Sequence, residues 1–360
     1  MTGGGTGGHI YPALAIADKI KKKNQSAEIL FIGTSKGLEK EIVPKHGYNI
    51  EFIEVSGFNR KSIIKNIRTI RNLFKGIKQA NEIIDRFNPD VVIGTGGYVC
   101  GPVVRAAHKK GIRTFIHEQN AYPGLTNKML EKFSNKIFIS FEESRKYFKD
   151  QSKLILSGNP LRKEFIYVNQ SENRNELNIS DDEFAVLCFS GSLGSETINT
   201  SMISAIKKIT AQDKIKVYFI TGKRYFEQVI EELKDIEPTT NEAINVMPYT
   251  DELYKYMSAS DLIISRAGAL TISEITALGK ASVLVPSPNV ANNHQFYNAK
   301  ILSDAACSIL IEEKDLSEGK IFDTIMKLKN NKQQVNKMSR ISKDLGKLDS
   351  VEIIYENIEI

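Results

Sequence analysis

The glycine-rich stretch 3–8 constrains this chain most, because its five glycines lead directly into a helical pattern. Glycine has no Cβ and tolerates positive φ, so such a turn can direct N–H groups and the positive end of a helix toward an anion. Pro12 suits a first helical turn, and apolar residues then recur at i, i+3, i+4 and i+7 from Ala13 to Ile20. The sequence therefore predicts a phosphate-binding loop followed by a helix, with His9 at the mouth of the loop.

Only Met1 and Thr2 precede these glycines, where a buried strand would normally deliver such a loop. We expect either that the first strand is missing or that the start of the chain is late. Further along, short β-branched runs alternate with helical patterns, in one series over residues 29–156 and a second over 185–311. Continuous apolar strands separated by helices predict an α/β fold with doubly wound parallel sheets, covered by helices on both faces.

The two series predict two domains of the same architecture that face each other across a cleft. A turn at 158–160 and the polar segment 172–183 indicate a boundary near residue 160. We expect an N-terminal domain over 1–160, a C-terminal domain over 161–338, and a terminal helix within 339–360 that returns to the N-terminal domain. Because ligands of doubly wound sheets bind beyond the carboxyl ends of the strands, the glycine-rich corners of both domains should converge there.

Composition excludes several classes of protein. Three widely spaced cysteines give no disulfide frame and are typical of a reducing compartment. No apolar run approaches the ~18 residues that cross a bilayer, and the first residues lack an export signal, so we expect neither a spanning nor an exported protein. A net charge of +6 favours anionic partners such as a polyanion or an acidic membrane, although so modest an excess often serves solubility.

Polar side chains follow a predicted strand end in the first half, at 117–120. Because a buried sugar hydroxyl without a partner costs about 1–3 kcal/mol, such an array is typical of sugar recognition. The glycine cluster at 94–102 serves either a ligand or close helix packing. His9 is either a general base in the cleft or a structural histidine at a helix start.

The second half has polar residues after two strand ends. A predicted strand at 262–264 leads into a helix with Glu274 one turn from its start. Glu274 either compensates the helix dipole, worth about 0.3–1 kcal/mol, or accepts both hydroxyls of a ribose. Gln295 follows another strand and is placed to reach a donor sugar. The strand at 31–32 is not followed by the acidic residue that holds the ribose of a dinucleotide, so a nicotinamide cofactor is disfavoured.

A basic amphipathic segment runs from Arg60 to Lys78, with seven basic residues and no acid over an apolar stripe at helical spacing. It is either an ordinary core-facing helix with a solvated basic side or an interfacial helix that meets anionic lipid headgroups. In the second case the lipid contacts would be Lys65, Arg68, Arg71, Lys75 and Lys78.

Six motifs stand in one order along nearly the whole chain. They are Gly-Gly-Thr-Gly-Gly-His-Ile-Tyr-Pro at 4–12, Gly-Gly-Tyr-Val-x-Gly-Pro at 96–102, His-Glu-Gln-Asn-x-x-Pro-Gly-Leu-Thr-Asn-Lys at 117–128, Gly-Asn-Pro-x-Arg at 158–162, Ser-Arg-x-Gly-Ala-Leu-Thr-x-Ser-Glu at 265–274 and His-Gln-x-x-Asn-Ala at 294–299. Together they resemble glycosyltransferase family 28, whose GT-B fold has two Rossmann-like domains. The resemblance implies inverting transfer of N-acetylglucosamine from UDP-N-acetylglucosamine to the 4-hydroxyl of the MurNAc sugar in undecaprenyl-pyrophosphoryl-MurNAc-pentapeptide. That reaction converts lipid I to lipid II in peptidoglycan synthesis.

The resemblance also implies roles for single residues. It makes His9 the base, adds Glu118 and Asn120 to the catalytic set, and assigns to the acceptor Tyr98, His117 and Asn127. The donor-binding residues that it implies are Thr6, Gly7, Gly8, Asn120, Arg162, Ser192, Tyr249, Arg266, Ala269, Leu270, Thr271, Ile272, Ser273, Glu274 and Gln295. It implies no metal and no cofactor, and the sequence has no Asp-x-Asp metal motif.

The partners implied by the resemblance are UDP-N-acetylglucosamine, lipid I, an anionic inner-leaflet surface bound through Arg60 to Lys78, and other cell-wall synthesis proteins, with no nucleic acid. The implied location is the cytoplasmic face of the cell membrane, as a peripheral protein. Leu193 departs from the family pattern, which has a polar side chain beside the phosphates at that position. Three other functions stay open: glycosylation of diacylglycerol, epimerisation of a UDP-sugar, and RNA binding by a nonenzymatic basic module, for which aromatic-rich RNA signatures are lacking.

Overall fold

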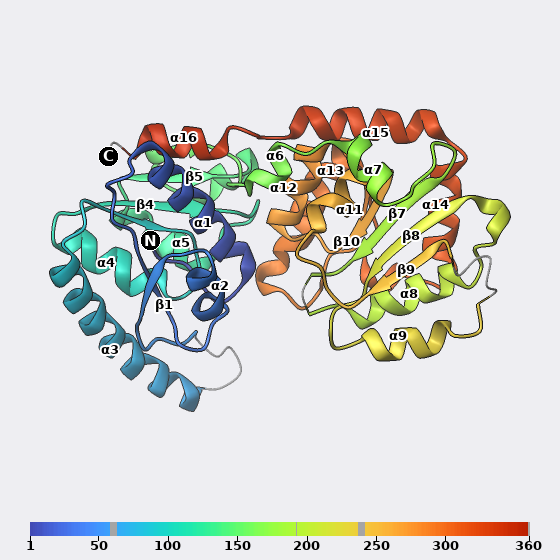
Figure 1. Cartoon of the computed structure of the whole chain (residues 1–360). Coiled ribbons are helices and arrows are strands. Elements are labelled where there is room, and N and C mark those ends of the chain that lie inside the picture. The colour runs from blue at the N-terminus through green and yellow to red at the C-terminus, as the bar shows by residue number, and fades with distance from the viewer. Residues whose placement is uncertain (58–62, 192, 237–241, 359–360) are drawn as a thin grey trace. The chain divides into compact units, whose positions relative to one another are not determined.

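The computed structural model describes residues 1–57, 63–191, 193–236 and 242–358, with the backbone alone for 63–68 and 70. The chain forms two compact units, of which unit 1 consists of Met1–Arg162 and Lys347–Ile360 and unit 2 of Lys163–Gly346 (Figure 1). Unit 2 extends to residue 346, past the expected boundary at 338, because the last long helix before it, α15 (Lys332–Leu345), packs Val335 and Met338 into the core of unit 2.

Unit 1 is built on parallel strands. These are β1 (Leu30–Gly33), β2 (Asn49–Phe52), β3 (Val91–Gly94), β4 (Arg113–Glu118), β5 (Lys136–Ile139) and β6 (Leu154–Leu156). They form a two-stranded sheet β1-β2 and a four-stranded sheet in the order β3-β4-β5-β6. Thr2 joins the two, since it pairs with both Ile32 and Gly94. Met1 and Thr2 thus lie between β1 and β3, and the glycine loop follows them directly.

Helices cover both faces of this sheet because alternate strand residues point to opposite sides. One face packs against α1 (Gly7–Lys23) and α16 (Ser350–Asn357) through Ile93, Phe115 and Phe138. The other face packs against α3 (Ile63–Phe87), α4 (Cys100–Lys109) and α5 (Leu125–Leu130) through Val92, Ile116, Ile137 and Ile139. In Figure 1 the red helix α16 lies along the blue helix α1, so the end of the chain returns to unit 1.

The remaining elements of unit 1 are short. Helix α2 (Glu39–Lys45) packs Val43 against α1 and β1. The 3₁₀ helices are η1 (Glu131–Phe133), η2 (Glu142–Tyr147) and η3 (Gln151–Lys153). Among the residues that the structure describes, no helix combines the length and apolar composition that a membrane crossing needs.

Unit 2 contains one parallel sheet in the order β12-β11-β10-β7-β8-β9. The strands are β7 (Phe184–Phe189), β8 (Ile215–Ile220), β9 (Ile244–Met247), β10 (Leu262–Ser265), β11 (Ala281–Leu284) and β12 (Ser308–Leu310). The chain runs outward from β7 to β9, returns to the other side of β7, and runs outward again to β12. The strand order therefore reverses between β7 and β10, which is the point where doubly wound sheets bind ligands.

The helices of unit 2 again cover a sheet. They are α6 (Lys163–Ile166), α7 (Gln170–Glu176), α8 (Glu196–Ile206), α9 (Phe226–Leu233), α11 (Leu253–Ala259), α12 (Ala269–Leu278), α13 (His294–Asp304), α14 (Lys320–Lys329) and α15, with the 3₁₀ turns η4 (Ala211–Asp213), η5 (Ala291–Asn293) and η6 (Glu313–Asp315). The largest buried cluster joins β7, β8, β10 and β11 to α8, α9 and α14.

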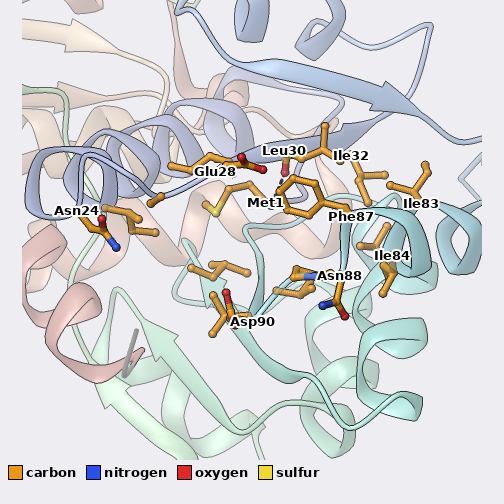
Figure 2. Close-up of a pocket in the computed structure, with 18 of the residues that line it drawn as sticks. Met1, Asn24, Glu28, Leu30, Ile32, Ile83, Ile84, Phe87, Asn88 and Asp90 are labelled. Atoms are coloured by element: carbon orange, nitrogen blue, oxygen red, sulfur yellow. Dashed lines mark hydrogen bonds between the residues drawn. The ribbon is translucent and has the colours of Figure 1, made fainter.

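A cavity of about 460 Å³ lies beside Met1 in unit 1, between β1 and β3 (Figure 2). Its lining includes Leu30 and Val91, the first residues of those two strands, together with the helix-end residues Asn24 and Phe87. The α-amino group of Met1 donates to the carbonyl of Leu30 at 2.8 Å, and burial lowers its pKa to about 5. Because substrates of such sheets bind beyond the carboxyl ends of the strands, this cavity at the amino ends is not the candidate site.

Candidate active site

The first glycine loop ends where α1 begins, at Gly7. Thr6 is the N-cap residue with an extended backbone (φ −139°, ψ 156°), and its carbonyl accepts the N–H of His9 at 3.1 Å. Gly5 and Thr6 are exposed, whereas His9 is half-buried. The N–H groups of the first turn therefore lie beside the imidazole, as the sequence predicts for a loop that binds an anion.

A second loop, after β3, sets the orientation of the His9 ring. Nδ1 of His9 lies 3.1 Å from the carbonyl oxygen of Thr95 and 3.2 Å from Oε1 of Gln119. Because both neighbours are acceptors, Nδ1 carries the proton, and Nε2 of the neutral ring keeps its lone pair. Gly96 makes this geometry possible, since a Cβ there would lie 2.5 Å from Nδ1.

A chain of hydrogen bonds leads from His9 into the core of unit 1. Gln119 offers Oε1 to His9, and its Nε2 donates to Nδ1 of His117 at 2.9 Å. Nε2 of His117 then donates to the carbonyl of Gly158 at 3.0 Å. His117 is 0% exposed, and burial lowers its pKa to about 4, so it is neutral near pH 7. This buried ring positions Gln119 behind His9 and does not present an edge to solvent.

Glu118 holds together the loop that follows β4. Its Oε1 accepts the backbone N–H of Asn120 at 2.9 Å and the side-chain amide at 3.2 Å. Its Oε2 accepts the N–H of Gly124 at 3.0 Å and Nδ2 of Asn127 at 2.7 Å. These four donors satisfy both oxygens of the buried carboxyl group. This geometry supports a positioning role for Glu118 in which it shapes the loop that carries Asn120.

The remaining unit 1 residues lie around these loops. Thr6, Gly7 and Gly8 form the start of α1, and Tyr98 is exposed just before α4. The guanidinium of Arg162 lies 5.0 Å from the centre of the Tyr11 ring, on the helix that carries His9. Asn127 is buried, and its Oδ1 has no hydrogen-bond partner among the described residues, which favours a ligand or solvent donor there.

In unit 2 the expected donor residues gather at the switch point between β7 and β10. Helix α12 follows β10 directly, with Gly268 as its N-cap, so the amides of Ala269, Leu270 and Thr271 lie at the carboxyl edge of the sheet. Ile272 is buried in the core and would reach a ligand only through its backbone. Ser273 donates its hydroxyl to the carbonyl of Ala269 at 3.0 Å, and the carboxyl side chain of Glu274 is mostly buried one turn into the helix.

Arg266 is held by a network within unit 2. It donates to the hydroxyl of Ser195 at 2.6 Å and to the carbonyls of Val285 and Pro286, and it forms an ion pair with the carboxylate of Glu313. With these partners Arg266 joins the second glycine loop to the end of β11. This geometry supports a positioning role for Arg266, in which it holds these two segments and neighbouring groups contact the ligand.

Two further predicted donor positions in unit 2 are Gln295, in the first turn of α13, and Tyr249, on the loop after β9. Gln295 accepts the N–H of Ser287 at 2.8 Å through Oε1. Tyr249 is exposed, and its hydroxyl donates to Asp251 at 3.0 Å. Ser192 lies outside the described residues. Leu193, the departure from the family pattern, is 81% exposed, so its apolar side chain does not contribute to the core.

Sequence reasoning missed Gln119, Glu39 and Glu313 as parts of this machinery. Gln119 stood in the polar cluster after β4, but its partner His9 is 110 residues away. Glu39 accepts the N–H of Gly5 in the first loop at 2.9 Å, and Glu313 holds Arg266. No local pattern marks the latter two. Among the described residues, no group of His, Cys, Asp and Glu side chains is arranged to hold a metal ion.

The two units define the class of the protein. Each has a Rossmann-like parallel sheet with helices on both faces, and each has a glycine loop at the carboxyl edge near its central strands. This is the GT-B fold of nucleotide-sugar glycosyltransferases. Residues 1–139 match the model of the glycosyltransferase family 28 N-terminal domain, and residues 185–354 match that of the C-terminal domain. The chain belongs to glycosyltransferase family 28.

Relatives with assigned names match the chain over its whole length. A protein of Thermoanaerobacter sp. (strain X514) is 47% identical over 360 residues, covering 100% of this chain and 98% of the relative. A protein of Clostridioides difficile (strain 630) is 43% identical, covering 99% and 87%. Both carry the name UDP-N-acetylglucosamine--N-acetylmuramyl-(pentapeptide) pyrophosphoryl-undecaprenol N-acetylglucosamine transferase.

Solved structures with the same fold include enzymes of two reaction types. The crystal structure of Acinetobacter baumannii MurG is similar with a TM-score of 0.78 and 26% identity, covering 100% of this chain and 98% of that one. UDP-GlcNAc 2-epimerase from Neisseria meningitidis has a TM-score of 0.67 and 15% identity, covering 97% and 96%. At 15% identity the second likeness shows the fold alone.

Replacing Gly96 by alanine should destabilise unit 1. The residue has φ +113°, and a Cβ would lie 2.5 Å from the His9 ring, so backbone strain and overlap together cost about 2–4 kcal/mol. Gly101→Ala is the matched control, because Gly101 has open space at its Cβ position and lies in α4. Urea unfolding measures both variants, and equal stability of the two would contradict this account of Gly96.

The buried His117 should make stability depend on pH. The folded pKa of about 4 lies below the ordinary 6.5, so between these values the unfolded chain binds a proton that the folded chain does not. The free energy of unfolding should therefore fall by up to about 3 kcal/mol as the pH drops from 7 to 4. His117→Asn should flatten this dependence in chemical unfolding, while replacement of the exposed His108 by Asn should leave it unchanged. Parallel curves for wild type and His117→Asn would refute the assignment.

Proposed function

We propose that this chain transfers N-acetylglucosamine from UDP-N-acetylglucosamine to the 4-hydroxyl of the MurNAc sugar in undecaprenyl-pyrophosphoryl-MurNAc-pentapeptide. The reaction converts lipid I to lipid II in peptidoglycan synthesis. The observation that carries this proposal is the full-length match, at 47% identity, to a relative named for this transfer. The geometry of His9 supports it, because the ring is oriented with Nδ1 as donor and Nε2 as base.

His9 acts as the general base in a single displacement. Nε2 removes the proton of the acceptor hydroxyl while the hydroxyl oxygen attacks the anomeric carbon of the donor. The bond from that carbon to the diphosphate oxygen breaks, UDP departs with the electron pair, and the configuration inverts. Gln119 and Thr95 keep the Nδ1 proton in place and stabilise the imidazolium that forms, so both act as positioning residues.

Unit 2 binds the donor. The amides at the start of α12 and at the start of α8 stabilise the developing negative charge on the diphosphate, as at other helix N-termini. Glu274 accepts the ribose hydroxyls, and Gln295 contacts the sugar. Unit 1 binds the acceptor, with the exposed Tyr98 as the proposed contact, whereas Asn127 is buried. His117 and Glu118 act as positioning residues without contacting the acceptor, because both are buried among their own partners.

His9→Gln should separate chemistry from donor binding. We expect kcat to fall by about 10²–10⁴-fold because the general base is lost, with the KM for UDP-N-acetylglucosamine unchanged. Glu274→Gln should instead raise the KM for UDP-N-acetylglucosamine, because the charged group that accepts hydrogen bonds from the ribose hydroxyls is replaced by a neutral one. UDP release with and without a lipid I analogue measures both variants.

The outcomes of this assay are distinct. Wild-type turnover in His9→Gln would contradict the assignment of His9 as the general base but not the transferase activity. UDP release that does not depend on lipid I would contradict the assignment of lipid I as the acceptor. Conversion of UDP-N-acetylglucosamine to its 2-epimer would instead support the reaction named for the structural neighbour from Neisseria meningitidis.

We also propose that α3 brings unit 1 to an anionic membrane surface at the cytoplasmic face, where other cell-wall synthesis proteins are further partners. Phe74 is 69% exposed, and Arg71, Lys75 and Lys78 are exposed around it. Lys75 also pairs with Glu54 at 2.5 Å, and Lys78 lies 3.9 Å from Glu82, so part of the basic charge is balanced. Arg60 lies outside the described residues, as do the side chains of Lys65 and Arg68.

Phe74→Glu should weaken binding to vesicles of phosphatidylglycerol and phosphatidylcholine. Losing the burial of one aromatic ring and adding a negative charge should reduce the affinity at least about tenfold. Tyr167→Glu is the matched control, because Tyr167 is an 83% exposed aromatic residue in unit 2. Vesicle sedimentation measures binding, and an equal effect of both changes would contradict the assignment to α3.

A further inference from the structure

Glu39 is a fully buried carboxylate behind the glycine loop of unit 1, with 0% exposure. Its Oε2 accepts the N–H of Gly5 at 2.9 Å. Its Oε1 accepts the N–H and the hydroxyl of Thr34 at 2.9 and 2.8 Å. A buried charge without such donors costs several kcal/mol, so these bonds fix where the side chain lies. Glu39 thereby joins the exposed tip of the loop to the carboxyl end of β1.

The space around this carboxylate is made by glycines from separate segments. A Cβ at Gly4 would lie 2.5 Å from Oε1 of Glu39, one at Gly33 2.6 Å from Cγ, and one at Gly37 2.0 Å from Oε2. Because none of these residues has a side chain, the loop 3–8, the end of β1 and the start of α2 can all approach the same group. The arrangement is thus specific for one carboxylate.

We propose that Glu39 is a positioning residue for the transfer reaction, an inference that rests on the proposed function. It holds Gly5, and through the next residues it sets the start of α1 and the place of His9. On the other side the loop is held by a longer bond, from the N–H of Gly4 to the carbonyl of Gly96 at 3.3 Å. A catalytic group displaced by about 1 Å can lose about 10²-fold in rate, so Glu39 acts on turnover without touching substrate.

Glu39→Gln removes the loop bond while keeping the volume of the side chain. An amide has one acceptor oxygen, and Thr34 presents two donors to one oxygen, so that oxygen stays with Thr34. The NH₂ group then opposes the N–H of Gly5, and the bond is lost. We expect kcat of UDP release with a lipid I analogue to fall by about 10²-fold, with the KM for UDP-N-acetylglucosamine unchanged.

Two control variants separate this role from a general effect on folding. Thr34→Val removes one donor from the same carboxylate but leaves the bond to Gly5, so it should keep nearly wild-type kcat. Glu41→Gln changes an exposed carboxylate in the same helical turn and should have no effect. Equal loss of kcat in Glu39→Gln and Thr34→Val, or wild-type kcat in Glu39→Gln, would overturn the proposal.

Amide hydrogen exchange tests the same contact without any substrate. Exchange at Gly5 should accelerate in Glu39→Gln and stay at the wild-type rate in Thr34→Val, and unchanged exchange in Glu39→Gln would also overturn the proposal. If Glu39→Gln fails to fold, Glu39→Asp serves, because it keeps the charge and withdraws it from Gly5. If the wild-type chain releases no UDP, only the proposed function is contradicted. The exchange experiment still tests the contact between Glu39 and Gly5.

Discussion

The position of one imidazole depends on close contact between two loops that carry almost no side chains. Gly97 approaches Gly4 so closely that a Cβ would lie 2.5 Å from the Gly4 carbonyl oxygen, and one on Gly3 would lie 2.0 Å from the hydroxyl of Thr95. That hydroxyl donates to the backbone carbonyl of His9 at 2.7 Å. With the backbone held this way, the ring has room only because Gly96 has no side chain. The sequence suggests phosphate binding for the glycines, and several of them also allow this contact.

Charge and polarity inside unit 1 are arranged to keep those loops in place. Glu118 and Glu39 are buried carboxylates surrounded by N–H or O–H donors. The donors to Glu118 come from the segment that follows β4, whereas those to Glu39 come from its own loop and from the glycine loop. His117 is kept neutral by burial, so it can hold Gln119 without adding a positive charge behind His9. Networks of this kind are rigid when every member is satisfied, which suits a base that must meet its substrate in one orientation.

Fold alone does not decide the chemistry, because a transferase and an epimerase share it among the solved structures. In unit 2 the strand order reverses between β7 and β10, and ligands of doubly wound sheets bind at such a switch point. The full-length relatives, which are named for the transfer, favour the transferase. The exposed Leu193 shows that the second glycine loop tolerates an apolar residue without changing the core.

The sequence by itself determined the alternation of strands and helices, the two glycine loops and the place of His9 at the end of the first loop, because periodicity and motif spacing are local properties. It did not determine that His117 and Glu118 point inward, since their polar character suits a ligand and a buried network equally well. Nor did it indicate the contacts of Glu39 with Gly5, of Gln119 with His9 or of Glu313 with Arg266, because each joins residues far apart in the sequence. Such pairs are created only when strands distant in sequence become neighbours in a sheet, so tertiary structure alone decided which polar groups position the site.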